Sequence, residues 1–314
     1  MASYALERRV NVKTFEGRVA VITGAGSGFG REFALKAARL KMKVVLADVQ
    51  ENSLYFIRED LEDQGAEVLA VQCDVSDRNQ VQALADAAMA KFGAVHVVFN
   101  NAGVSSAGLI WEHSHEDWEW VMGVNVWGVI HGVRIFTNLM FECAKRDPDY
   151  EGHIVNTASM AGFLSTPLSS IYDTTKHAVV AISECLYQDL LLVNVPIHTS
   201  VICPYFVPTG ISQSARNRPA NLPAGELTAS QKAAQFMIER AIVSSKVSAR
   251  DIANLTFEAI EKEQFYIYSH PGALGLVKDR MDDILKQQNP GDPYKTAPHI
   301  RTMLLNKMAE NAKD

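Results

Sequence analysis

The chain of 314 residues has few cysteines and no long hydrophobic run. Cys73, Cys143, Cys185 and Cys203 lie far apart without a C-x-x-C pair, each within or beside an apolar segment. We expect them to be buried free thiols rather than a disulfide framework. The sequence lacks a run of about 18 apolar residues, so it predicts no membrane-spanning helix. Residues 1–15 lack the apolar core of a secretory signal, and we expect a cytoplasmic protein.

An excess of basic residues is also missing. The 30 Lys and Arg residues stand against 36 Asp and Glu residues, which gives a formal net charge of −6. Nucleic acids and anionic membranes attract clustered positive charge, so neither is expected as the main partner. With 47% hydrophobic residues, the composition is not that of a disordered chain. A chain of this length buries a large core without disulfides or a structural metal.

Short apolar runs alternate with helical patterns along most of the chain. Continuous or nearly continuous apolar runs predict strands at residues 19–23, 43–48, 68–72, 95–100, 153–157, 197–202 and 265–268. Apolar residues three and four apart predict helices at residues 31–41, 53–63, 77–92, 114–145, 170–194, 230–244, 250–263 and 274–288. This alternation predicts an α/β fold, a single Rossmann-type doubly wound domain with a mainly parallel seven-stranded sheet flanked by helices.

The domain organisation follows from the same pattern. Length alone suggests two domains at roughly 150 residues each, but the alternation predicts one, at residues 17–270. Residues 1–16 then form an N-terminal extension, and residues 271–314 form a helical C-terminal extension. Residues 205–245 begin in a proline-rich stretch that follows a strand, which is typical of a mobile cover over a binding site.

A glycine-rich turn, Thr-Gly-Ala-Gly-Ser-Gly-Phe-Gly, occupies residues 23–30 between the first strand and the first helix. Such glycines let the backbone approach a pyrophosphate, which then rests on the helix N-terminus. Asp48 ends the next strand, 18 residues after Gly30, where a carboxylate accepts hydrogen bonds from an adenosine ribose. The turn lacks the lysine of a nucleoside triphosphate loop. A purely structural tight turn is the alternative, and the context favours a dinucleotide.

Asp48 also bears on which dinucleotide binds. A carboxylate at this place repels a 2′-phosphate, whereas sites for NADP supply a basic residue nearby. Val49 and Gln50 are uncharged, and the turn offers Ser27 instead of a base. The sequence therefore predicts a preference for NAD(H).

Tyr172 and Lys176 lie four residues apart at the start of a predicted helix, so they share one face. A phenol with a pKa of about 10 is a poor base at neutral pH, and a neighbouring ammonium or an oxidised nicotinamide stabilises its phenolate. Ser159 follows a strand 13 residues earlier and is placed to hydrogen-bond a substrate oxygen. Taken alone, a Tyr and a Lys at this spacing are more often surface decoration.

Together these residues resemble the short-chain dehydrogenases/reductases, from about residue 13 to residue 268. The motifs that carry the resemblance appear in order: Thr23-Gly24-x-x-x-Gly28-x-Gly30, Asp74-Val75, Asn100-Asn101-Ala102-Gly103, Asn125, Ser159 and Tyr172-x-x-x-Lys176. The resemblance implies an oxidoreductase that transfers hydride between a nicotinamide and a secondary alcohol or ketone.

The resemblance also implies residue roles. Tyr172 would exchange a proton with the substrate oxygen, and Ser159 would orient that oxygen. Lys176 would lower the pKa of Tyr172 and bind the nicotinamide ribose, and Asn125 would interrupt a helix and hold a water in a proton relay. The implied cofactor-binding residues are Gly24, Gly26, Ser27, Gly28, Phe29, Gly30, Asp48, Val49, Asp74, Val75, Asn101, Ala102, Gly103, Tyr172, Lys176, Pro204, Val207 and Thr209.

The sequence departs from this family at three places. Tyr205 replaces a usual glycine and is expected near the nicotinamide or the substrate, and Phe29 stands where Ile or Leu is usual. Asp173 is unusual beside the Tyr172 phenol but points to another helix face, so we expect a weak effect. Residues 111–120 are rich in His and acidic residues, yet they read as a capped helix start, and no metal site is predicted.

The substrate is expected to be a hydrophobic or aromatic secondary alcohol or its ketone, since the residues expected around it are mainly apolar: Ser105, Leu109, Trp111, residues 160–164, Tyr205, Phe206 and Ile211. No arginine is expected there to pair with a substrate carboxylate or phosphate. The apolar helices at residues 118–141 and 171–192 favour a homodimer or homotetramer, as the resemblance implies, with a thick core as the alternative. NADPH-dependent carbonyl reduction and a non-catalytic dinucleotide-binding sensor are the other functions considered.

Overall fold

Seven parallel strands form one sheet in the order β3-β2-β1-β4-β5-β6-β7. The computed structural model describes residues 14–312, so the extension predicted at residues 1–16 lies almost wholly outside the described part. The strands are β1 (Val19–Thr23), β2 (Lys43–Asp48), β3 (Val68–Gln72), β4 (Val97–Asn100), β5 (Gly152–Thr157), β6 (Ile197–Cys203) and β7 (Tyr266–Tyr268). The fold predicted from the apolar runs is confirmed, because a parallel sheet covered on both faces needs strands that are apolar on both sides.

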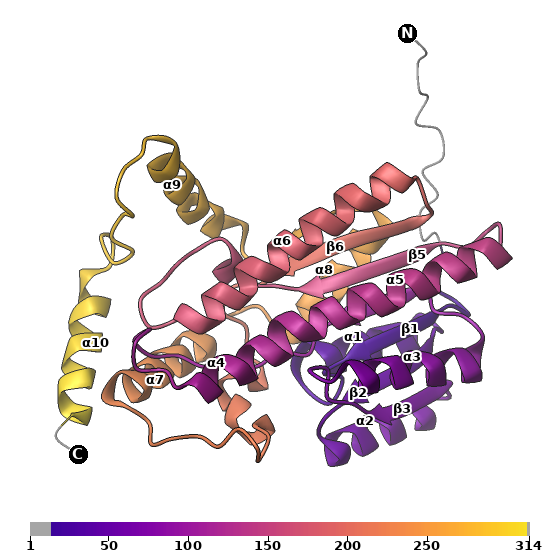
Figure 1. The fold of residues 1–314 in the computed structure, drawn as a ribbon, viewed down its shortest axis with the longest axis horizontal. Coiled ribbons are helices and arrows are strands. Elements are labelled where there is room, and N and C mark those ends of the chain that lie inside the picture. The colour runs from indigo at the N-terminus through magenta and orange to yellow at the C-terminus, as the bar shows by residue number, and fades with distance from the viewer. Residues whose placement is uncertain (1–13, 313–314) are drawn as a thin grey trace, which may run out of the picture.

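Helices cover both faces of this sheet (Figure 1). They are α1 (Gly28–Arg39), α2 (Glu51–Asp63), α3 (Arg78–Phe92), α4 (His115–Met122), α5 (Gly128–Arg146), α6 (Ser170–Val193), α7 (Ala229–Val243), α8 (Ala249–Glu261), α9 (Leu274–Leu285) and α10 (Pro298–Asn311). Four short segments join them: a π-helix, η1 (Gly123–Trp127), and the 3-10 turns η2 (Met160–Gly162), η3 (Gly210–Asn217) and η4 (Pro271–Ala273).

The predicted helix at residues 114–145 needs one correction. The structure divides it into α4, η1 and α5, and η1 is the π-helical turn that contains Asn125. The other predicted helices are present, with ends that differ by no more than three residues. The π-helical turn leaves no trace in apolar spacing because it inserts into an otherwise continuous helix.

Two apolar layers hold the sheet between the helices. One layer packs α1, α2 and α8 against the sheet, and in it the Phe33 ring stacks on Phe99 with centroids 4.6 Å apart. The other layer packs α3, α5 and α6 against the opposite face, around Phe136 and Met140. The carboxyl ends of the strands therefore remain as the edge at which a site is built.

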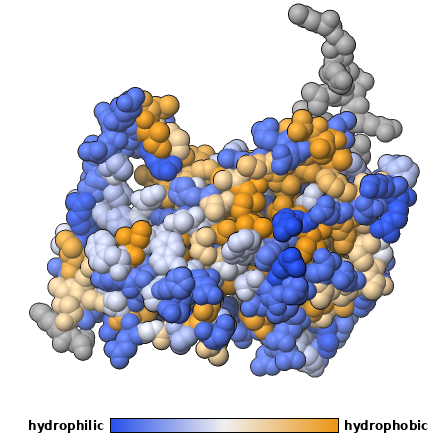
Figure 2. Space-filling model, viewed as in Figure 1, coloured by the Kyte–Doolittle hydropathy of each residue, from blue (hydrophilic) through white to orange (hydrophobic). Residues whose placement is uncertain are grey.

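The C-terminal segment leaves the sheet after β7. Helix α9 begins against an apolar cluster, on which Leu274 and Val277 pack, and then extends outward in Figure 1. Helix α10 packs against α7, where Asn311 Nδ2 donates to the carbonyl of Ala229 at 3.3 Å. Figure 2 shows apolar surface at α9, where Ile284 and Leu285 are exposed. Within residues 14–312, no helix is both long and apolar enough to cross a membrane. The boundaries of the two extensions stay a prediction.

All four cysteines are free. Cys73, Cys143 and Cys203 are buried, but Cys185 on α6 is exposed, contrary to the expectation of burial. Helix α6 presents one face to solvent, and a residue on that face is exposed even when its neighbours in the sequence are apolar.

One prediction concerns the contact between α5 and β4. A Cβ on Gly132 would lie 1.9 Å from Asn100 Oδ1, within a buried network in which Asn100 Nδ2 donates to Asn156 Oδ1 at 2.8 Å. We expect Gly132→Ala to lower the free energy of unfolding by about 1–3 kcal/mol, because the methyl group overpacks this contact. Urea denaturation measures the difference.

The matched control is Gly275→Ala in α9, where the added Cβ meets no atom within 4 Å. That change should raise the free energy of unfolding by about 0.5–1 kcal/mol, since glycine is the poorer helix former. Equal stability of the Gly132→Ala variant and the native chain would contradict the close approach.

Candidate active site

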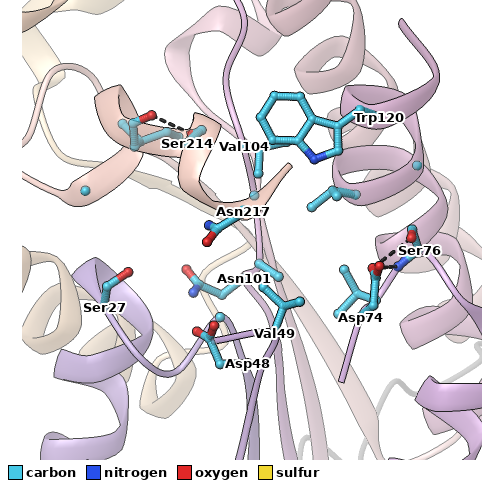
Figure 3. Close-up of a pocket in the computed structure, with 18 of the residues that line it drawn as sticks. Ser27, Asp48, Val49, Asp74, Ser76, Asn101, Val104, Trp120, Ser214 and Asn217 are labelled. Carbon is cyan, nitrogen blue, oxygen red and sulfur yellow. Dashed lines mark hydrogen bonds between the residues drawn. The ribbon is translucent and has the colours of Figure 1, made fainter. Parts of the chain in front are cut away.

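A cavity of about 530 Å³ opens at the carboxyl ends of the strands. Its walls come from the glycine turn, the ends of β2, β4 and β5, the start of α6, and the segment after β6 (Figure 3). We call residues 205–245 the cover, because η3 and the residues after it close one side of this cavity.

Glycine is required at several positions of the turn. A Cβ on Gly30 would lie 2.1 Å from the carbonyl oxygen of Gly24, and Gly24 itself has a φ of +65°. A Cβ on Gly26 would meet Ser53 Cβ at 2.8 Å, and one on Gly28 would meet Thr209 Cβ at 3.2 Å. These approaches keep the floor of the cavity free of side chains, and the N-terminus of α1 points its free amides there.

Asp48 shapes the adjoining wall. Its Oδ2 accepts a hydrogen bond from the Gly26 amide at 2.8 Å, and its Oδ1 accepts one from the Gln50 amide at 2.9 Å. Figure 3 shows Asp48 and Ser27 on one side of the cavity, with Asn217 of the cover facing them. The Asp48 carboxylate thus holds the glycine turn in place, and Asp48 also lines the cavity.

Hydrogen bonds join the strand ends across the cavity floor. Asn101 Nδ2 donates to the carbonyl of Thr23 at 2.9 Å, and the Thr157 hydroxyl donates to Asn101 Oδ1 at 3.3 Å. The Lys176 ammonium then donates to the carbonyl of Thr157 at 2.8 Å. The lysine on α6 is therefore tied to the end of β5.

Tyr172 and Lys176 both line the cavity, and the Lys176 Nζ lies 5.5 Å from the centroid of the Tyr172 ring. Burial raises the pKa of Tyr172 to about 12, while a hydrogen bond with Ser159 lowers it and the Asp173 charge raises it by a smaller amount. Burial also lowers the pKa of Lys176 to about 8. In the protein alone, desolvation therefore outweighs any pull of the ammonium on the phenol.

Asp173 is turned away from the phenol, as expected. Its Oδ2 accepts from the Thr166 amide at 2.7 Å and its Oδ1 from the Ser169 hydroxyl at 2.7 Å. These hydrogen bonds hold the loop between η2 and α6 in place. Burial raises the pKa of Asp173.

Asn125 lies inside the π-helix η1, as predicted for a helix interruption, and is fully buried. Its Oδ1 accepts from the Val104 amide at 2.9 Å, and its Nδ2 donates to Thr175 Oγ1 at 3.0 Å. The side chain joins the loop after β4 to the start of α6, so it positions the helix that carries Tyr172.

The structure brings most of the predicted site residues together. Those that line the cavity are Gly24, Gly26, Ser27, Gly28, Phe29, Asp48, Val49, Asp74, Val75, Asn101, Ala102, Gly103, Tyr172, Lys176, Pro204 and Thr209. Four predicted residues do not line it. Gly30 packs under the turn, Val207 belongs to the core, Asn125 lies behind the wall, and Ser159 donates to the carbonyl of Pro204 at 3.2 Å.

Some residues expected near the substrate lie elsewhere. Trp111 is 75% exposed, and the Tyr205 ring packs against Phe206 and His270, with centroids 4.7 and 5.9 Å away. Neither lines the cavity. The Tyr205 amide donates to Ser269 Oγ at 3.0 Å, which turns that residue toward the C-terminal segment.

The cover is attached to α4 by a charged contact. Ser114 and Asp117 form a capping box at the start of α4, which is the capped helix start predicted there. The Arg218 Nη1 donates to Asp117 Oδ1 at 2.5 Å, and its guanidinium lies 5.2 Å from the Trp120 ring centroid. No group of three or more potential metal ligands occurs among the described residues.

A second attachment lies at the start of α7. Glu112 accepts hydrogen bonds from the hydroxyls of Thr228 at 2.5 Å and Ser230 at 2.6 Å. Between the two attachments lies a further cavity of about 260 Å³, which shares Trp120, Ile211 and Ser214 with the first.

Two arginines at these cavities were missed by the sequence analysis. Arg216 lines the first cavity and Arg218 the second, so arginines do lie at these cavities, although Asp117 already pairs with Arg218. The proline-rich cover has no periodicity that would reveal which of its side chains turn inward. Their contacts with residues about a hundred or more positions earlier in the chain appear only in the fold.

Comparison with known proteins agrees with this geometry. Residues 18–220 match the family described as short chain dehydrogenase. A short-chain dehydrogenase/reductase from Burkholderia phymatum, solved in complex with NAD, has 52% sequence identity and a TM-score of 0.86, covering 89% of this chain and 98% of its own.

Two relatives carry named activities. A CLA biosynthesis dehydrogenase/reductase of Lactiplantibacillus plantarum is 34% identical, over 89% of this chain and 97% of its own. A 1-deoxy-11-beta-hydroxypentalenate dehydrogenase of Streptomyces exfoliatus is 32% identical, over 92% of this chain and 98% of its own. The chain belongs to the short-chain dehydrogenase/reductase family, and it is an oxidoreductase that acts on CH–OH groups.

A prediction follows for the Asp117–Arg218 contact. His113 and Arg218 hold the pKa of Asp117 well below its ordinary value. A carboxylate with a lowered native pKa stabilises the fold above its unfolded pKa of about 3.9, and this stabilisation is lost as the pH falls toward the native pKa. Asp117→Asn should therefore lower the free energy of unfolding at pH 7 by about 1.5–3 kcal/mol, with a smaller difference at pH 3.

Urea denaturation of both proteins at several pH values measures this difference. Glu119→Gln, which neutralises an exposed carboxylate on the same helix, should change stability by less than about 0.5 kcal/mol. A difference for Asp117→Asn that does not depend on pH would mean that the charge of Asp117 is not what stabilises the cover.

Proposed function

We propose that the protein interconverts a hydrophobic or aromatic secondary alcohol and its ketone, with NAD(H) preferred over NADP(H) and Tyr172 as general acid and base. The observation that carries the proposal is that Tyr172 and Lys176 line the same cavity as the glycine turn and Asp48. A dinucleotide site and an acid/base pair in one cavity are what hydride transfer to or from a carbinol carbon needs.

The residues present fit a dinucleotide. The turn leaves room that a Cβ at Gly26 or Gly28 would fill, and Asp48 stands at the end of β2 for the adenosine ribose. Asp74 and Val75 would flank the adenine, and Lys176 would bind the nicotinamide ribose. When bound, the nicotinamide supplies the hydride acceptor for oxidation or the donor for reduction.

The chain's own residues then manage the proton. In oxidation, the Tyr172 phenolate takes the proton of the substrate hydroxyl as the C–H bond breaks, and in reduction the phenol returns it to the carbonyl oxygen. Ser159 would hydrogen-bond the same oxygen by turning its hydroxyl from the carbonyl of Pro204, to which it donates in the structure. Asn125 positions the start of α6 through Thr175 and so sets the direction of the phenol.

The substrate class rests on the second cavity. Its lining includes apolar side chains from the loop after β4 and from the cover, among them Ala107, Ile211, Leu227 and Ile238, beside polar ones such as Ser105, Glu112 and Gln231. Arg218 also lines it, but Asp117 neutralises this guanidinium, so it offers no free charge to a substrate carboxylate. The relatives' names, which refer to CLA biosynthesis and a hydroxypentalenate, support an apolar alcohol.

The test of the activity is a panel of alcohols and ketones with NAD(H), followed by nicotinamide absorbance. Aryl and alicyclic carbinols should be oxidised with higher kcat/KM than short hydroxy acids. Tyr172→Phe should lower kcat by at least about 10²-fold, in line with the loss of a general acid/base, and should leave the Kd for NADH within about twofold.

The pH dependence has a defined sign. Because burial raises the pKa of Tyr172, most of the phenol is protonated at neutral pH, and the phenolate fraction grows about tenfold per pH unit below that pKa. The kcat/KM for oxidation should rise between pH 7 and pH 9, while that for reduction stays nearly level. Faster turnover of hydroxy acids or an oxidation rate independent of pH would contradict the proposal.

The cofactor preference gives a separate prediction. Asp48 lines the cavity at the ribose end and repels a 2′-phosphate. We expect kcat/KM with NAD to exceed that with NADP at least tenfold, and Asp48→Asn to narrow this ratio by removing the repulsion. Steady-state rates with both cofactors measure the ratio, and equal values in the native protein would refute the preference.

Assembly as a homodimer or homotetramer and location in the cytoplasm stay predictions. Exposed apolar residues at the end of α6 support assembly, notably Leu192 and Val193, which are 83% and 55% exposed.

A further inference from the structure

Arg216 belongs to the cover but lies at the ribose corner of the cavity. Its Nη2 is 3.5 Å from the hydroxyl of Ser27, and its carbonyl accepts a hydrogen bond from Gln50 Nε2 at 3.3 Å. Ser27 follows Gly26, whose amide binds one oxygen of Asp48, and the amide of Gln50 binds the other. Arg216 therefore contacts Gln50, whose amide binds Asp48, and Ser27, which follows the other residue that binds Asp48.

The guanidinium is held in place by its own segment. Its Nη1 donates to the carbonyls of Gly210 and Gln213, both at 2.8 Å. These bonds leave the Nη2 side turned toward Ser27. Preorganised in this way, the side chain loses little rotamer freedom when it meets a ligand.

The positive charge of Arg216 has no carboxylate partner among residues 14–312. The ion pairs found in this part of the chain include Arg218 with Asp117 but none with Arg216. A fixed arginine with free donors at the wall of a cavity suits a phosphate, which accepts two parallel hydrogen bonds from the guanidinium.

We propose that Arg216 receives a phosphate at the 2′ position of the adenosine ribose, so that the cover gives this protein a measurable affinity for NADP(H) despite Asp48. The 2′ position follows from Asp48, since the acidic residue at the end of the second strand marks the ribose hydroxyls and a nearby arginine accommodates a 2′-phosphate. The inference rests on the proposed dinucleotide site and deepens it, because it makes the preference for NAD(H) a balance between Asp48 and Arg216.

The experiment measures binding without turnover. Isothermal titration gives the Kd of adenosine 2′,5′-bisphosphate and of adenosine 5′-monophosphate, which differ only in the 2′-phosphate, and then of NADPH and NADH. Arg216→Gln should raise the Kd of the two 2′-phosphorylated ligands about tenfold or more and change the other two by less than about threefold. Arg216→Lys should fall between, because it keeps the charge and loses the paired donors.

The control variant is Arg240→Gln, which removes an arginine of the same cover that packs on Phe236 outside both cavities. It should leave all four Kd values within about twofold. If Arg216 had only a structural role, its replacement would weaken the binding of all four ligands alike. The ratio of the NADPH and NADH affinities therefore separates a structural role from a phosphate-binding role.

Three results would overturn the inference: an equal loss for all four ligands, no change for any, or no measurable NADPH binding by the native protein. Failure of the proposed activity can be told apart from failure of this inference. If the protein does not oxidise alcohols but the ratio of its NADPH and NADH affinities still depends on Arg216, the proposed activity is wrong and the role of Arg216 stands.

Discussion

A chain of hydrogen bonds across the strand ends supports the rest of the site. It runs from Thr23 at the end of β1, through Asn101 after β4 and Thr157 at the end of β5, to the Lys176 ammonium on α6. The first two links join neighbouring parallel strands at the edge where backbone pairing stops, and the last joins β5 to α6. The glycine turn and the catalytic helix are thereby fixed to one sheet edge, and a shift of either would leave buried polar groups unpaired.

The burial that holds this arrangement also sets the charge states of the pair. Desolvation raises the pKa of Tyr172 and lowers that of Lys176, so both shifts favour the neutral forms. A phenolate at this place needs compensation from outside the pair, which a cationic ring would supply. In water, the same two groups would keep their ordinary pKa values. Because this pair is buried, formation of the phenolate depends on the charge of a bound ligand.

The layers of the fold, and most of the residues that line the first cavity, could be predicted from the sequence because both depend on local patterns. Apolar runs mark strands buried on both faces, and the turn at residues 23–30 needs glycines for backbone reasons that act within eight residues. The π-helical turn around Asn125 was recognisable only as an interruption. The inward arginines of the cover were not predictable, because Arg216 meets Ser27 and Arg218 meets Asp117 across 189 and 101 positions. Tyr205 was misplaced for the same reason, since its neighbour His270 lies in the C-terminal segment.

The cover is held differently from the core, and this difference bears on how the cavity opens. The core layers are apolar and continuous, whereas the cover buries few apolar side chains, among them Val207, Ala233 and Ala234. It is also attached by the hydrogen bonds of Arg218 with Asp117 and of Thr228 and Ser230 with Glu112. Polar contacts of this kind exchange with water at a small net free energy, while separating an apolar layer exposes its full area. Segments with few buried apolar contacts open at lower free energy than the core. On this ground we expect the cover to open at a lower free energy than the layers that hold the sheet.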